Sequence, residues 1–182
     1  MNINMQISKK EYALSIGLIH LYSGILTFLL VVVFLLCFSF LWDYETFING
    51  ATYILHHFNS IFILFGGILL HQLIHALTAS RFTTKGFNSL KFNLRLKILP
   101  YYNCKEPLMV NQYKIVLLMP IIILGIIPLI FAFISGNAII FIYGLFFVSF
   151  SSTDLILLFL LRRAKSEDRI FRHPDKAGFY IE

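Results

Sequence analysis

The sequence is poor in charged residues and in cysteine, and both shortages narrow the class of protein. Only 13% of its 182 residues are charged and 58% are hydrophobic, whereas soluble domains average about 25% charged and about 45–50% apolar residues. Two cysteines, Cys37 and Cys104, are too few for a disulfide framework or a cysteine metal site. The apolar excess is gathered in long runs, so the composition predicts an integral membrane protein.

The net charge of +6 does not indicate nucleic-acid binding. The charged residues lie between the apolar runs, where Lys and Arg orient helices in a bilayer, and no alternation of basic and aromatic residues suits base recognition. We therefore expect a lipid bilayer and no nucleic acid as partner. The first apolar run is too long for a signal peptide and lacks a small-residue cleavage site. Cys37 is expected in the core and Cys104 as a reduced cytoplasmic thiol.

Four apolar runs are each long enough to cross a bilayer, which takes about 20 residues. The predicted spans are residues 15–42, 60–80, 115–134 and 138–161. Pro120 and Pro128 are each able to kink the third span, and Gly66-Gly67 permits a close helix approach in the second. The sequence predicts an all-α membrane protein with four transmembrane helices, forming a single membrane-embedded domain over residues 1–182.

The charges of the segments between the spans predict how the chain is oriented. Residues 1–14 carry a net charge of +1, residues 43–59 carry −2, residues 81–114 carry +6, and the tail from Arg162 carries +2. Because positive segments stay in the cytoplasm, both termini are expected there.

Residues 90–98 alternate strictly between apolar and polar side chains, which is the period of a β-strand. Turn-forming residues from Lys85 to Ser89 precede this stretch, and Pro100 is expected to end it. The pattern is compatible with a short β-hairpin in the cytoplasmic loop between the second and third helices. Such a strand would either pair with an extended substrate or lie on the membrane with its lysines toward lipid phosphates.

Two histidines, His71 and His75, lie four residues apart in the second span. Residues at i and i+4 share one face of a helix, so both imidazoles can reach one metal ion. In the His-Glu-x-x-His motif a glutamate between such histidines serves as general base, but here its position is occupied by Gln72.

Asp154 is the one acidic residue inside any predicted span. His71, His75 and Asp154 lie ten, six and eight residues before Arg81 or Arg162 at the cytoplasmic ends of their helices. At about 1.5 Å per residue, all three lie roughly 9–15 Å from those ends. Two histidines and a carboxylate leave the fourth position of a tetrahedral zinc ion for water. The alternative is a polar cluster without metal.

Other segments extend the pattern around the histidines. They are Leu70 to Ala76, Cys104 to Leu108, Tyr113 to Pro120, Gly125 to Pro128, Ser152 to Asp154, and His173-Pro174 through Gly178-Phe179. With them, the chain from about Gly66 onward resembles the putative zincin peptidase family of small bacterial multi-pass membrane metalloproteases. The resemblance implies Zn²⁺ held by His71, His75 and Asp154. It also implies a site design similar to that of site-two intramembrane proteases.

The family has glutamate where this chain has Gln72, and an amide cannot exchange protons near neutral pH. General acid–base catalysis contributes about 10²–10⁴-fold. We therefore expect a zinc metallopeptidase that cleaves membrane or membrane-associated proteins near the cytoplasmic face through a zinc-bound water, with this chain nearly inactive.

Two explanations of Gln72 stay open. It is either a substitution introduced into a protease, or the natural residue of a pseudoprotease that binds membrane clients without cleaving them. A transporter relaying protons or metal ions through His71, His75 and Asp154 is a third alternative. It is disfavoured because residues 61–70, in the outer half of the second span, offer no ionisable group.

Overall fold

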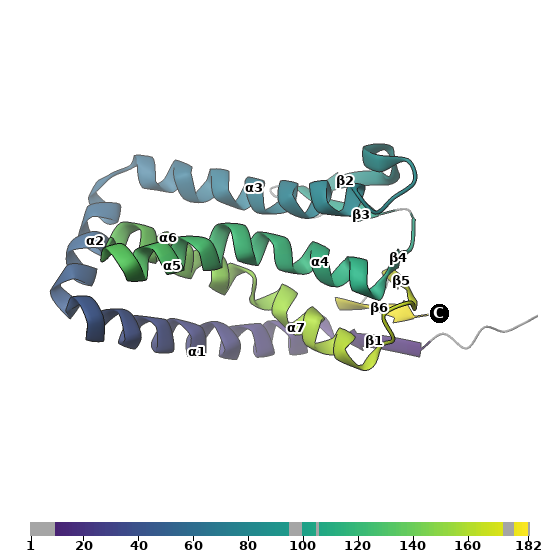
Figure 1. The fold of residues 1–182 in the computed structure, drawn as a ribbon, viewed down its shortest axis with the longest axis horizontal. Helices are drawn as coiled ribbons and strands as arrows, with labels where there is room; N and C mark the ends of the chain where they lie inside the picture. Colours follow the sequence, from purple (N-terminus) through teal and green to yellow (C-terminus); the bar gives the residue numbers. More distant parts are fainter. Residues whose placement is uncertain (1–9, 95–99, 105, 173–176, 182) are drawn as a thin grey trace, which may run out of the picture.

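The computed structural model describes residues 10–94, 100–104, 106–172 and 177–181. Its long helices lie side by side, and the strands gather at one end of them (Figure 1). The helices are α1 (Ile16–Trp42), α2 (Tyr44–His56), α3 (Asn59–Ser80), η1 (Gly86–Ser89), α4 (Val110–Pro120), η2 (Ile121–Ile126), α5 (Ile127–Ser135), α6 (Ala138–Phe150), α7 (Ser152–Leu160) and η3 (Leu161–Arg163). The strands are β1 (Lys10–Leu14), β2 (Leu90–Leu94), β3 (Pro100–Cys104), β4 (Leu108–Met109), β5 (Arg169–Arg172) and β6 (Ala177–Ile181).

Within the described part of the chain, three helices are long and apolar enough to cross a membrane: α1, α3 and the continuous stretch Val110–Ser135. The first two agree with the predicted spans at 15–42 and 60–80. The third begins at Val110 rather than at residue 115, because it follows directly from β4 and the side chain of Gln112 accepts a hydrogen bond from the Met109 N–H. Within it, η2 is a π-helix that begins immediately after Pro120.

The predicted fourth span is two helices, α6 and α7, which make an angle of 42°. They amount to a fourth apolar span if the pair is counted as one. The bend falls at Ser151, whose hydroxyl donates a 2.9 Å hydrogen bond to the Phe147 carbonyl one turn earlier. A serine that bonds back to the preceding turn often bends a helix, and this supplies a local cause for the bend.

Residues 43–59, expected to be a simple connector, contain the amphipathic helix α2. It packs on the start of α6, where a Cβ on Gly50 would overlap Ala138. Beside it, the stacked rings of Phe38 and Phe141, with centroids 4.1 Å apart, belong to an apolar core. Cys37 is exposed on α1, so its prediction as a core residue was wrong.

The prediction of an all-α fold was incomplete, because a four-stranded antiparallel sheet has the order β1-β6-β5-β4. It joins the first described residues to the last, with Ala13 opposite Gly178. Gly178 has a φ of +152° and a Cβ there would overlap the β1 backbone, so this position requires glycine. Phe179 of β6 packs with Val110 and Leu161, which fixes the ends of α4 and α7 against the sheet.

The connector between α3 and α4 contains a hairpin, since β2 pairs antiparallel with β3. The predicted strand is confirmed only at Leu90–Leu94, and residues 95–98 of the alternation lie outside the described residues. The expected turn before it is the helix η1, and Pro100, expected to end the strand, instead begins its partner β3. The Glu106 carboxylate accepts hydrogen bonds from Ser89 and from the N–H and hydroxyl of Thr84. These bonds, Ser89's foremost, lower the pKa of Glu106 to about 2. Burial raises the pKa of the neighbouring Cys104 thiol.

Candidate metal centre

Helix α3 carries both histidines on the face that packs against the rest of the helices. His71 is 2% exposed and His75 is 4% exposed. Close packing of α3 on α6 is possible because Gly67 has no side chain: a Cβ there would overlap the Phe147 ring, whereas one on Gly66 would meet nothing within 4 Å. The predicted close approach is therefore confirmed at Gly67 and not at Gly66.

Asp154 reaches the two histidines from the first turn of α7. Its Oδ2 lies 3.3 Å from His71 Nε2 and 3.4 Å from His75 Nε2. The two Nε2 atoms are 3.1 Å apart. The structure thus brings together the three residues that the sequence singled out, from helices about 80 residues apart in the chain.

The spacing of these three atoms fits one face of a tetrahedron around a small metal ion. Zinc bonds of about 2.0–2.1 Å at tetrahedral angles place neighbouring ligand atoms roughly 3.3 Å apart. The observed edges of 3.1, 3.3 and 3.4 Å agree with that separation. The donor set of two imidazoles and one carboxylate is also one that catalytic zinc uses.

A backbone carbonyl fixes the orientation of His75. Its Nδ1 lies 2.8 Å from the Val116 carbonyl oxygen on α4, which can only accept, so Nδ1 carries the proton. The neutral ring then presents the lone pair of Nε2 to Asp154 and His71. Metal-bound histidines characteristically donate their other N–H to such a partner.

The environment of His71 is different. Its ring is perpendicular to that of Phe150, with centroids 5.2 Å apart. Its buried Nδ1 has no hydrogen-bond partner among the described residues. Of the two histidines, His75 is therefore the one whose second ring nitrogen is held by a hydrogen bond to a described residue.

The three ligand atoms converge so closely that something must lie between them. With Nδ1 of His75 donating to Val116, lone pairs on His75 Nε2 and Asp154 Oδ2 would otherwise face each other. A proton on one of the three groups, or a metal ion bound by all of them, resolves this conflict. The group is therefore one that could hold a metal ion.

The comparison with protein families decides the affiliation. The model of the putative zincin peptidase family matches residues 64–168, which is more than half of the chain. The chain belongs to this family. Searches of curated proteins and of solved structures found no match.

The zincin match includes every candidate site residue and runs from α3 to the segment just before β5. Zincin peptidases are named for zinc, and the His71, His75 and Asp154 group offers this chain a place for it. The predicted similarity of the tail, from His173 to Phe179, lies beyond the match. Of that tail, residues 173–176 also lie outside the described residues.

Gln72 follows His71 on α3 and is half-buried. Its assignment as the position of the zincin general base remains a prediction from the motif. The same holds for the ligand roles of His71, His75 and Asp154, for which the geometry described above is suitable.

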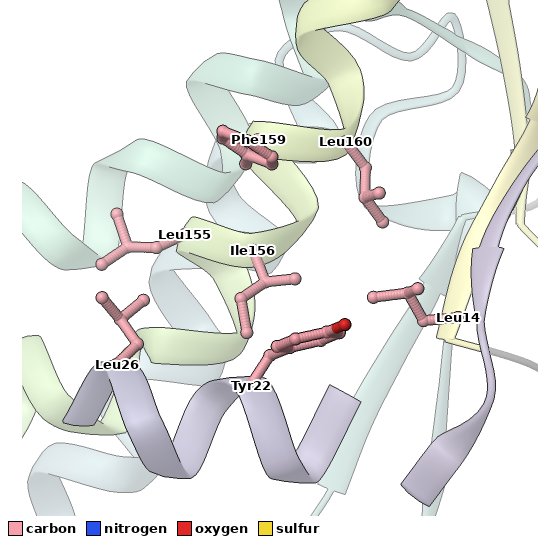
Figure 2. Close-up of a pocket in the computed structure, with 7 residues that line it drawn as sticks. All are labelled: Leu14, Tyr22, Leu26, Leu155, Ile156, Phe159 and Leu160. Carbon is pink, nitrogen blue, oxygen red and sulfur yellow. The ribbon is translucent and has the colours of Figure 1, made fainter. Parts of the chain in front are cut away.

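An apolar pocket of about 450 Å³ lies beside α7, the helix that carries Asp154 (Figure 2). It is lined by residues of β1, α1 and α7, namely Leu14, Tyr22, Leu26, Leu155, Ile156, Phe159 and Leu160. At about 100° per residue, the lining positions of α7 are turned at least a quarter of the helix away from Asp154. The pocket therefore faces away from the histidines.

Sequence reasoning missed the supporting residues of this site. Val116 was not singled out, because a backbone carbonyl leaves no mark in the residue type. Ser151 was not recognised as a bend, although it opens the polar run Ser151-Ser152-Thr153 in an apolar stretch. Pro120 was expected only to kink its helix. A signal for the carbonyl did exist, since a proline at position 120 deprives residue 116 of its helical donor.

Proposed function

We propose that this chain has the site of a membrane-embedded zinc metallopeptidase that hydrolyses peptide bonds near the cytoplasmic face. The observation that carries the proposal is the triangle of His71 Nε2, His75 Nε2 and Asp154 Oδ2, with edges of 3.1–3.4 Å. Membership of the zincin peptidase family supports the reaction class.

Each residue of the site has a defined task in this proposal. His71, His75 and Asp154 hold the metal, and the Val116 carbonyl keeps the Nε2 atom of His75 directed at it. A bound zinc ion supplies Lewis-acid activation of water and polarises the peptide carbonyl. The low exposure of both histidines keeps competing solvent away from the ligand atoms.

Position 72 controls proton transfer in this proposal. A glutamate there would take a proton from the attacking water and pass it to the leaving amine. The amide of Gln72 does neither at neutral pH, so the chain as written lacks a contribution of about 10²–10⁴-fold. Glutamine matches glutamate closely in size, and metal binding is expected to persist.

The placement in a membrane rests on the apolar helices and on the distribution of charge. Strands β1 and β6 pair at the end of the helices where the basic connector between α3 and α4 also lies (Figure 1). A shared end for both terminal strands supports an even number of crossings. With the net charge of +6 in residues 81–114, this end is the cytoplasmic one. The proposed location is a bacterial cytoplasmic membrane, and the proposed substrates are membrane or membrane-associated proteins.

A second candidate function follows from Gln72 itself. A chain that keeps the metal ligands but lacks the general base suits a pseudoprotease that binds membrane clients without cleaving them. This alternative shares the metal centre and differs in whether position 72 naturally carries glutamine.

The test restores the missing carboxylate. Gln72→Glu is assayed against a panel of membrane-associated peptides, beside the parent chain and the double variant Gln72→Glu with His71→Ala. We expect cleavage to rise at least about 100-fold over the parent and to disappear in the double variant. A zinc-loaded Gln72→Glu variant that cleaves nothing in the panel would favour the pseudoprotease. If the zinc content of the parent chain falls far below one ion per molecule, both functions are contradicted.

A further inference from the structure

The hydrogen bond that orients His75 uses a carbonyl that a helix normally keeps for itself. Val116 lies within α4, and its side chain is fully buried. In a regular α-helix the carbonyl of residue 116 accepts the N–H of residue 120. Here it lies 2.8 Å from Nδ1 of His75, across the contact between α3 and α4.

Residue 120 is the proline that makes this possible. Proline has no N–H, so it cannot occupy the carbonyl four residues earlier. Pro120 is fully buried at the end of α4, and the helix continues after it as the π-helix η2. Breaks of this kind within a helix are frequent at functional sites.

We propose that Pro120 is a positioning residue for the metal ligand His75. It acts by leaving the Val116 carbonyl free to accept a hydrogen bond from the Nδ1–H group of His75. The inference rests on the proposed metal centre and adds to it the residue that keeps one ligand in the correct tautomer and orientation. The Pro120 side chain has no atom that could bind a metal. Its effect passes through the backbone of α4.

An ordinary residue at position 120 would compete with His75 for the same oxygen. Its N–H would point along the helix toward the Val116 carbonyl and would draw that carbonyl parallel to the axis and away from His75. The imidazole of His75 would then lose the partner that fixes its ring. Loss of an outer-shell partner typically lowers metal affinity about 10–100-fold.

The matched control is the other proline of the same apolar stretch. Pro128 lies in the first turn of α5, where its missing N–H concerns the carbonyl of residue 124. Neither proline side chain offers a metal ligand or a hydrogen-bond donor. Pro120→Ala and Pro128→Ala therefore make the same chemical change in one helix, and only the first alters the donor set around Val116.

The experiment measures the zinc affinity of the parent chain, Pro120→Ala and Pro128→Ala by competition with a chromophoric chelator. The visible absorption of each protein loaded with Co²⁺ and the thermal unfolding of each metal-free form are recorded in parallel. We expect Pro120→Ala to bind zinc about tenfold more weakly and to shift the Co²⁺ bands. Its metal-free form is expected to unfold at the parent temperature or above, because a proline inside a helix has been removed. Pro128→Ala is expected to keep the parent's affinity and spectrum.

The outcomes separate this inference from the function on which it rests. A parent chain that binds no zinc removes the metal centre and the inference together. A parent that binds zinc, with Pro120→Ala equal to it in affinity and in Co²⁺ spectrum, overturns the role of Pro120 alone. Equal losses of affinity in both proline variants, accompanied by lower unfolding temperatures, would show a general helix effect and also overturn it.

Discussion

Two apolar stretches of this protein are interrupted, and the two interruptions differ in cause and in effect. The stretch from α4 to α5 is interrupted at Pro120, where a donor is missing, yet it continues through a π-helix as one long element. The stretch from α6 to α7 turns by 42° at Ser151, whose hydroxyl donates an additional hydrogen bond to the Phe147 carbonyl in the preceding turn.

Both irregularities of the backbone position a group at the same candidate metal site, and they do so in different ways. The proline interruption leaves Val110–Ser135 one continuous helical stretch and leaves a carbonyl free for His75. The serine bend redirects the helix and delivers a side chain, Asp154, to the same cluster. One interruption changes a hydrogen bond and the other moves a ligand, so substitutions at the two places should differ in size of effect.

The largest effect is expected from the ligand that the bend delivers. Asp154→Ala should lower zinc affinity by more than about 100-fold, since loss of a direct ligand exceeds the 10–100-fold typical of outer-shell changes. Competition with a chelator measures it. Asp168→Ala, an acid outside the cluster, is the control and should keep the parent's affinity. Equal affinity in Asp154→Ala and the parent would remove α7 from the site.

A smaller effect is expected where Gly67 of α3 contacts Phe147, the residue whose carbonyl accepts the hydrogen bond from the Ser151 hydroxyl. A Cβ on Gly67 would overlap the buried ring of Phe147, so Gly67→Ala should destabilise the fold by about 1–3 kcal/mol through overpacking. Unfolding in detergent micelles measures this. The neighbouring Gly66→Ala meets nothing within 4 Å and should be neutral or slightly stabilising. Equal behaviour of the two variants would contradict the close approach at Gly67.

The bend itself can be tested by removing its hydroxyl. Ser151→Ala should lower zinc affinity about threefold, because one hydrogen bond contributes about 0.5–1.5 kcal/mol and the Ser151 N–H still bonds to the Phe147 carbonyl. This loss is smaller than the tenfold loss expected for Pro120→Ala. Ser152→Ala is the control. A larger loss for Ser151→Ala than for Pro120→Ala would reverse the comparison.

The smallest effect concerns the connector that leads into α4. The pKa of Glu106 is lowered to about 2, chiefly by the Ser89 hydroxyl, from an ordinary value near 4.5. The stability this confers is complete above pH 4.5 and is lost as the pH falls toward 2. Hydrogen exchange at the Thr84 amide, which donates to Glu106, should therefore speed up relative to its intrinsic rate over that range. Glu106→Gln does not titrate and should show no such step.

The sequence was sufficient for the parts of the site that depend on residue type and depth. His71 and His75 share a helix face by spacing alone, and Asp154 was matched to them by counting residues from the basic helix ends. These arguments need only a regular helix and a bilayer. They correctly group the three side chains because His71 and His75 lie in the α-helix α3 and Asp154 lies in the α-helix α7.

The rest depends on contacts between distant segments. No proline near Ser151 indicates the bend in the sequence. The angle of the bend also depends on how α6 and α7 pack on their neighbours. The four-stranded sheet joins β1 to β6 from opposite ends of the chain, and neither short strand has a strong local pattern. The role of the Val116 carbonyl required both a proline and the neighbouring α3, which only the fold brings together.

The pairing of β1 with β6 also sets an order of events during synthesis. Ala13 can pair only after Gly178, its partner 165 residues later in the chain, has been synthesised. At roughly 5–20 residues per second, translation of that interval takes roughly 8–33 s. All three candidate ligands have therefore been synthesised before β6 can pair with β1 and bring Phe179 against the ends of α4 and α7.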